Sequence, residues 1–126
     1  MSADKQGQGG VQWVKRDEVH PMSTAAGVEM RPMFGEQFLT CWVRLEPGAA
    51  VAQHSHVHEQ FGVITAGSLT VTAEGETRTM GTGEAYLVGS DIPHEATAGP
   101  DGAELVETFV PVREDFRELW ERSKPS

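Results

Sequence analysis

Cysteine, basic residues and long apolar runs are all scarce in this chain of 126 residues. The single cysteine, Cys41, excludes an intramolecular disulfide and makes a reducing cytoplasm the expected location. Ten Lys and Arg stand against nineteen Asp and Glu, and the net charge of −9 disfavours both nucleic acid and an anionic membrane surface as partners. No apolar run approaches the roughly 20 residues of a membrane span. The polar N-terminus predicts no secretory signal.

Turn-forming residues are abundant: fourteen glycines and seven prolines predict many turns. Short apolar runs alternate with these turns roughly every 8–12 residues, which is typical of an all-β sandwich or barrel. The runs lie at 11–14, 28–34, 38–45, 51–56, 60–65, 69–73, 77–80, 85–88, 94–98 and 103–110. We interpret residues 1–10 as a flexible N-terminal arm and residues 11–126 as a single domain.

Only the tail, residues 113–123, has a helical pattern. Phe116, Leu119 and Trp120 fall on one face, and acidic residues at the start with basic residues at the end suit the helix dipole. The run 38–45 is apolar on both faces. We therefore expect it to be buried by a partner subunit as well as by the core, which predicts a homodimer.

Histidines cluster in the segment HSHVHEQ, residues 54–60. In an extended strand, residues two apart share a face, so His54 and His56 can converge on one metal ion. By the same alternation Gln60 points to the face of His54 and His56, whereas Glu59 points to the opposite face. A single bulge residue would reverse this assignment. His58 also has ligand parity but lies at the expected bend, where a turn contact is the alternative to ligation.

A fourth candidate ligand, His94, follows the turn at residues 89–93. An antiparallel partner strand could bring it beside His54. The alternative for all these histidines is packing within a metal-free barrel.

Here the chain resembles the cupin family. Gly48, His54, His56 and Gly67 match the first cupin metal motif, and Gln60 stands where that motif has Glu. In the second motif Gly83 and His94 match, while Gly89, Asp91 and Ala98 replace its Pro, Gly and Asn. The resemblance covers roughly residues 28–113. It implies an all-β, jelly-roll cupin β-barrel, here followed by a short C-terminal helix.

The resemblance implies one divalent metal ion held by His54, His56, Gln60 and His94. Imidazole and carbonyl ligands leave zinc, nickel, iron and manganese all open. Because Gln60 is neutral, the ion would keep its full charge and act as a strong Lewis acid. We expect it to favour a small substrate that is anionic or polyoxygenated.

Within the cupins, the chain is similar to single-domain members with HSHPHEQ and an ending Asp-x-Phe-x-Pro-x-Arg. These include enzymes that open the ring of unsaturated uronates, and polyketide cyclases are more distant relatives. The resemblance places Glu107, Phe109 and Arg113 in the active site, with Glu107 replacing the Asp. Arg31 matches a recurrent Arg and is expected to face the same cavity. A solvent-facing position is the alternative for Glu107, and a salt bridge at the helix start is the alternative for Arg113.

Three functions follow as hypotheses. The first is a non-redox isomerase, lyase or cyclase in which the metal lowers the cost of enolate formation, Glu107 moves a proton and Arg113 or Arg31 holds a carboxylate. The second is a metal-dependent dioxygenase acting on a diol or dione. The third is a non-catalytic metabolite-binding cupin.

Overall fold

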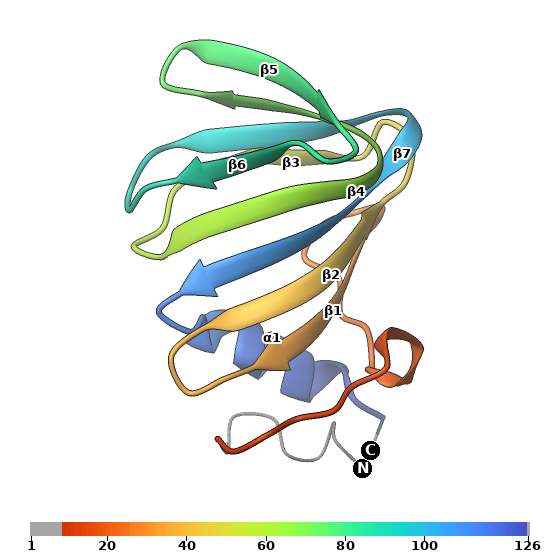
Figure 1. The fold of residues 1–126 in the computed structure, drawn as a ribbon, viewed down its shortest axis with the longest axis vertical. Coiled ribbons are helices and arrows are strands. Elements are labelled where there is room, and N and C mark those ends of the chain that lie inside the picture. The colour runs from red at the N-terminus through yellow and green to blue at the C-terminus, as the bar shows by residue number, and fades with distance from the viewer. Residues whose placement is uncertain (1–8, 126) are drawn as a thin grey trace.

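Among the described residues, seven strands and one α-helix form the fold. Figure 1 shows how these elements are arranged. The structure is a computed structural model that describes residues 9–125, so the predicted arm lies mostly outside the described residues. The strands are β1 (Val28–Phe34), β2 (Leu39–Leu45), β3 (Ala50–His54), β4 (Glu59–Ala73), β5 (Glu76–Gly81), β6 (Ala85–Val88) and β7 (His94–Val110). A 3-10 turn, η2 (Arg16–Glu18), precedes them, and α1 (Glu114–Ser123) follows. The predicted all-β class with a C-terminal helix is confirmed.

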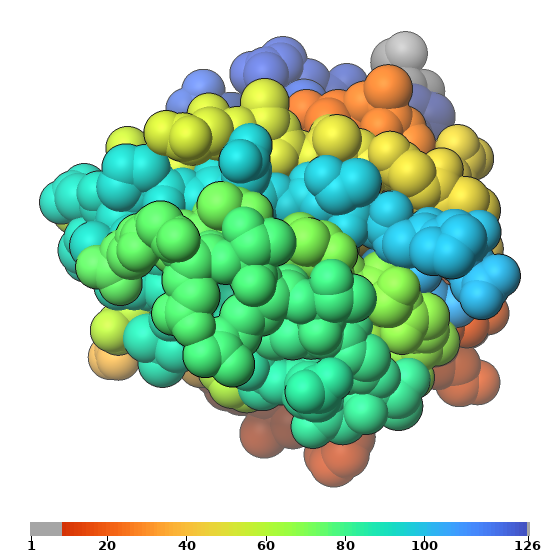
Figure 2. All heavy atoms as spheres, turned by 90° about the horizontal axis from the view of Figure 1, so that it is seen from above, coloured from red at the N-terminus to blue at the C-terminus, as the bar shows by residue number. Residues whose placement is uncertain are grey.

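The two long strands, β4 and β7, connect the two halves of the sheet, because each strand runs through both halves. Residues 59–67 of β4 pair with 103–110 of β7, and in this half β2 lies beyond β7 while β6 pairs with β4. Residues 69–73 of β4 pair with 94–98 of β7, and here β3 and β5 flank them. Figure 2 looks onto β5 with β3 and β7 beside it. Side chains from both halves line one internal cavity, so the halves face each other.

Two of the predicted turns are bends inside long strands. Residues 60–65 and 69–73 were expected to be separate strands, as were 94–98 and 103–110, but each pair forms one continuous strand. Gly67 has φ of 70°, and a Cβ there would lie 2.1 Å from the carbonyl oxygen of Gly102. A glycine at such a bulge looks the same in sequence as a glycine in a turn.

The ends of the chain differ in how well the sequence predicted them. Residues 11–14 are not a strand, and Trp13 is 73% exposed. Helix α1 instead lies where it was expected, against β1 and β2 at the end of the fold away from β5 (Figure 1). No helix in residues 9–125 has the length and apolar character that crossing a bilayer requires.

Trp120 anchors α1 to the sheet. Its ring is buried 5.6 Å from that of Phe34, and its Nε1 donates a hydrogen bond of 2.7 Å to the carbonyl of His20. One turn earlier on the helix, Phe116 packs against Phe109 of β7. The helix therefore closes the sandwich at the end where Phe109 lies.

We predict that Trp120→Ala lowers the free energy of unfolding by about 3–5 kcal/mol, because it removes a large buried ring and leaves a cavity. The matched control, Trp13→Ala, removes an exposed ring and should change stability by less than about 0.5 kcal/mol. Equilibrium urea denaturation measures both. An effect of Trp120→Ala as small as that of the control would show that α1 is not part of the cooperative unit.

Candidate metal centre and catalytic cavity

Three histidines meet where β3 ends and β7 begins. His54 and His94 are direct partners across this pair of strands, with ring centroids 4.3 Å apart. His56, in the loop after β3, lies 5.4 Å and 5.0 Å from them. One ring nitrogen from each histidine lies within 4.8 Å of the other two, so the three are positioned to bind one metal ion.

The loop that carries His56 is held by the loop before β7. Asp91 N donates a hydrogen bond to the carbonyl of His56 at 2.8 Å, and Ser90 Oγ donates to that of Val57 at 2.7 Å. Asp91 adopts a φ of 64°, in the left-handed region that favours glycine but that Asp tolerates better than most residues. This explains why a Gly stands at this position in the motif and how Asp can replace it.

Backbone carbonyls determine which ring nitrogen faces the cluster. The Nδ1 atoms of His54, His56 and His94 each lie 2.8 Å from the carbonyl oxygens of Ala52, His58 and Ile92, respectively. A carbonyl can only accept, so each Nδ1 carries the proton and each neutral ring has its lone pair on Nε2. Burial is the main cause that lowers the pKa of His56 and His94, which favours this neutral form. Neutral imidazoles are the form that ligates metals.

The Gln60 side chain points its oxygen at the same cluster. Its Nε2 donates to Glu107 Oε2 at 2.8 Å, so its Oε1 is the atom that lies 3.1 Å from His56 Nε2 and 3.2 Å from His94 Nε2. Lone pairs thus face one another with no proton between them. A cation among these atoms removes that repulsion, and an N₃O donor set suits a divalent metal. The residues present therefore fit the metal ion that the sequence predicts.

Glu107 lies on the inner side of β7 and lines the cavity, so it is not solvent-facing. Its Oε2 accepts hydrogen bonds from Gln60 Nε2 and from Tyr86 Oη, both at 2.8 Å. Burial raises the pKa of Glu107, against the opposing effect of these two donors and of Arg113. Burial and the charge of Glu107 together raise the pKa of Tyr86 well above its usual value, so Tyr86 keeps its proton.

Tyr86 is the polar residue that sequence reasoning missed. It is the only tyrosine in the chain and lies in β6, across from Gly62 of β4. An isolated glycine inside a strand is a recognised sign of close approach by another group. Gly62 was therefore a sign, visible in the sequence, that a large side chain packs over this position, and that side chain is Tyr86.

Arg113 and Phe109 also line the cavity. The Arg113 guanidinium lies 3.6 Å from the ring centroid of Phe116 and 5.1 Å from that of Phe109. It donates to both carboxylate oxygens of Asp115, at 2.7 Å and 3.2 Å. Burial alone would raise the pKa of Asp115, but this ion pair lowers it. Arg113 therefore makes the salt bridge at the helix start and still faces the cavity.

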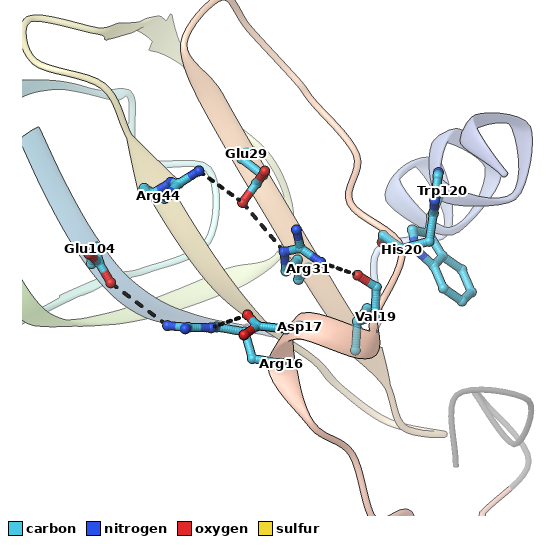
Figure 3. Close-up of polar contacts among 9 residues, drawn as sticks. All are labelled: Arg16, Asp17, Val19, His20, Glu29, Arg31, Arg44, Glu104 and Trp120. Atoms are coloured by element: carbon cyan, nitrogen blue, oxygen red, sulfur yellow. Dashed lines mark hydrogen bonds and ion pairs between the residues drawn. The ribbon is translucent and has the colours of Figure 1, made fainter. Parts of the chain in front are cut away.

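Arg31 lies elsewhere, contrary to the prediction. It is on the outer side of β1, opposite to Val28 and Met30, which line the cavity. Figure 3 shows its guanidinium directed to the carbonyl of Val19, at 2.6 Å, and to Glu29. The alternation of buried and partly buried residues along β1 places Arg31 outside, so it braces the N-terminal segment against the sheet.

His58 and Glu59 are not part of the cluster. The ring of His58 is 5.7 Å from that of His56, and its Nδ1 is buried with no partner among the described atoms. His58 contributes its backbone, since its carbonyl holds His56 Nδ1. Glu59 is exposed at the start of β4.

Most of the remaining cavity wall is apolar, although Thr24 and Glu95 also line it. The free volume is about 70 Å³, and the apolar part of the lining includes Val43, Val51, Leu69, Val71 and Leu105. The polar lining at the metal centre comprises His54, Gln60, Tyr86, His94, Glu107 and Arg113. A ligand in this space would meet metal-binding groups, the Glu107 carboxylate and a largely hydrocarbon wall.

A cupin-domain family model matches residues 41–109. The pectin degradation protein KdgF of Dickeya dadantii (strain 3937) is 33% identical over 84 residues, which is 66% of this chain and 76% of that protein.

Solved structures show the same fold. KdgF from a Halomonas species matches with a TM-score of 0.79 and 23% identity, over 85% of this chain and 99% of that one. The polyketide cyclase RemF of Streptomyces resistomycificus matches with a TM-score of 0.70 and 20% identity, over 81% of this chain and 80% of that one. From the site geometry, the family model and the KdgF match together, we conclude that this chain belongs to the cupin family.

Proposed function

We propose that this chain is a metal-dependent enzyme of non-redox type, an isomerase, lyase or cyclase. The observation that carries the proposal is the convergence of three imidazole lone pairs and the Gln60 oxygen beside the partly buried carboxylate of Glu107. The relatives support it, since they include a pectin degradation protein and a polyketide cyclase. Neither relative determines the reaction of this chain.

The proposed ligands are His54, His56, His94 and Gln60. A divalent cation there, whether zinc, nickel, iron or manganese, supplies Lewis-acid polarisation of a substrate oxygen. Glu107 accepts a proton from the carbon next to that oxygen and returns it at another atom. Its raised pKa suits this role, because a base with a pKa closer to neutrality can both take and give a proton.

The cavity favours a compact substrate with few hydroxyl groups inside the barrel. Much of its wall is hydrocarbon, and a hydroxyl left unpaired against it would cost about 1–3 kcal/mol. Arg113, in the polar lining, can bind a carboxylate or an enol oxygen of the substrate. The likeness to KdgF points to a uronate and the wall points to a polyketide-like dione, so both classes are the substrates to assay.

We predict that His56→Ala abolishes retention of the metal, because it removes one of the three imidazole ligands. Elemental analysis of the purified protein measures this as metal per chain. His58→Gln is the matched control: it changes the neighbouring histidine, whose ring does not join the cluster, and should keep the wild-type metal content. Equal metal content in His56→Ala and wild type would refute the proposed centre.

We predict that Glu107→Gln keeps the metal but lowers kcat by about 10²–10⁴-fold, the usual contribution of a general base. The glutamine retains an oxygen that can accept from Gln60 and Tyr86, so the site should stay assembled. The assays use unsaturated uronates and polyketide-like diones under strict anaerobiosis, where a dioxygenase would be inactive. Full activity of Glu107→Gln would eliminate Glu107 as the base.

We also propose that the chain forms a homodimer through the outer side of its sheet. Phe61 and Leu87, partners on β4 and β6, are 42% and 63% exposed, and Val110 at the end of β7 is 49% exposed. Trp42, Val106 and Val63 continue this apolar surface across β2, β7 and β4. A second copy of the same surface would remove these groups from water.

We predict that Leu87→Glu converts the dimer to a monomer, since it places a charge in the proposed interface. Sedimentation velocity measures the change. Thr77→Glu, an exposed substitution in β5, is the control and should leave the dimer intact. A wild-type protein that sediments as a monomer contradicts the proposal.

A further inference from the structure

We propose that Tyr86 is a positioning residue that keeps the Gln60 oxygen directed at the imidazoles, and that Gly62 exists to make room for it. The inference rests on the metal centre proposed above. It assigns a role to two residues that are not among the proposed ligands of the ion. The evidence is the register of three strands, the space above Gly62 and the direction of three hydrogen bonds.

The register brings Tyr86, Gly62 and Glu107 into one row. Gly62 of β4 is paired with Tyr86 of β6 on one side and with Glu107 of β7 on the other. Tyr86 therefore has to reach across β4 for its hydroxyl to meet the Glu107 carboxylate, which it does at 2.8 Å. Gln60 is two residues before Gly62 on β4, so its side chain points to the same side.

The ring of Tyr86 occupies the space that a side chain at position 62 would need. A Cβ on Gly62 would lie 2.5 Å from Cε2 and Cζ of Tyr86 and 2.6 Å from its Oη. Gly62 is not among the glycines with positive φ, so its backbone would accept an L side chain. Space for the tyrosine, rather than backbone conformation, is the reason for a glycine here.

The hydrogen bonds define the orientation of the amide. Tyr86 donates its single proton to Glu107 Oε2, and its oxygen is then free to accept from Gln60 Nε2 at 3.3 Å. Gln60 Nε2 gives its other proton to Glu107 Oε2. The Tyr86 oxygen and Glu107 Oε2 are both acceptors, so the end of the Gln60 amide that faces them has to be the NH₂ group.

A flipped amide would lose both contacts. Its oxygen would face the Glu107 carboxylate oxygen and the Tyr86 oxygen, neither of which has a proton left to give. Its NH₂ would face the imidazole lone pairs and could not ligate a cation. Tyr86 and Glu107 together therefore maintain Gln60 as an oxygen donor, and removing the Tyr86 hydroxyl weakens that preference.

The experiment measures Zn²⁺ affinity by competition with a chromophoric chelator. Tyr86→Phe, which removes only the hydroxyl, should weaken binding by about 10–100-fold, the usual effect of losing a group that orients a ligand. Gly62→Ala should weaken binding in the same direction by displacing the ring. Gly89→Ala is the matched control, since its Cβ would meet only Ile92, at an ordinary 3.9 Å, and should bind as wild type does.

Two further readouts separate positioning from a general loss of structure. In the Co²⁺-loaded protein, the visible spectrum of Tyr86→Phe should shift toward that of Gln60→Ala, which lacks the amide ligand altogether. Added to Tyr86→Ala, Gly62→Ala should cause no further loss of Zn²⁺ affinity, because the group it displaces is already gone.

The outcomes are distinct. Wild-type affinity and spectrum in Tyr86→Phe, with His56→Ala unable to bind Zn²⁺, would overturn the role of Tyr86 and leave the metal centre standing. Additive losses for Gly62→Ala and Tyr86→Ala would overturn the role of Gly62. A wild-type protein that binds no Zn²⁺ or Co²⁺ would overturn both this inference and the proposed centre.

Discussion

The side-chain amide of Gln60 joins the two chemical parts of this site. Its oxygen lies 3.1 Å and 3.2 Å from two imidazole nitrogens, and its nitrogen donates to the carboxylate of Glu107 at 2.8 Å. A glutamate at this position would place two carboxylates side by side, which Glu107 would tolerate poorly inside the barrel. The neutral ligand at position 60 and the acid at position 107 are therefore consistent with each other.

The site also depends on how the two halves of the sheet are held. His54 and His94 belong to the half formed with β3, whereas Gln60, Tyr86 and Glu107 belong to the half formed with β6. Apolar side chains between the halves set their separation, so the core packing also sets the distances in the site. Since a cation would bind groups from both halves, its binding would stabilise the folded state.

The alternation of side chains along a strand was a useful guide to the site, but only within the strands themselves. Strand parity predicted that His54, His56 and Gln60 share a face. The three lie close together, but His56 is in the loop after β3 and Gln60 is in β4, so a continuous strand is not the reason. The same rule applied to β1 puts Arg31 on one side with Glu29, which is the outer side. The resemblance suggested the cavity instead, and it was wrong there. The lengths of β4 and β7 were not predictable, because the sequence does not distinguish a glycine at a bulge, such as Gly67, from a glycine in a turn.

Glu107 shows why parity sometimes fails. Along β7, Leu105, Glu107 and Phe109 point inward, but the alternating residues Val106 and Val110 are apolar as well, so the sequence does not reveal which side is the core. A sheet whose outer side faced only water would carry polar residues there and would have resolved the question. The side to which Glu107 points is therefore ambiguous in the sequence because the outer side of β7 is apolar. A second copy of the chain covering that side would explain why it is apolar.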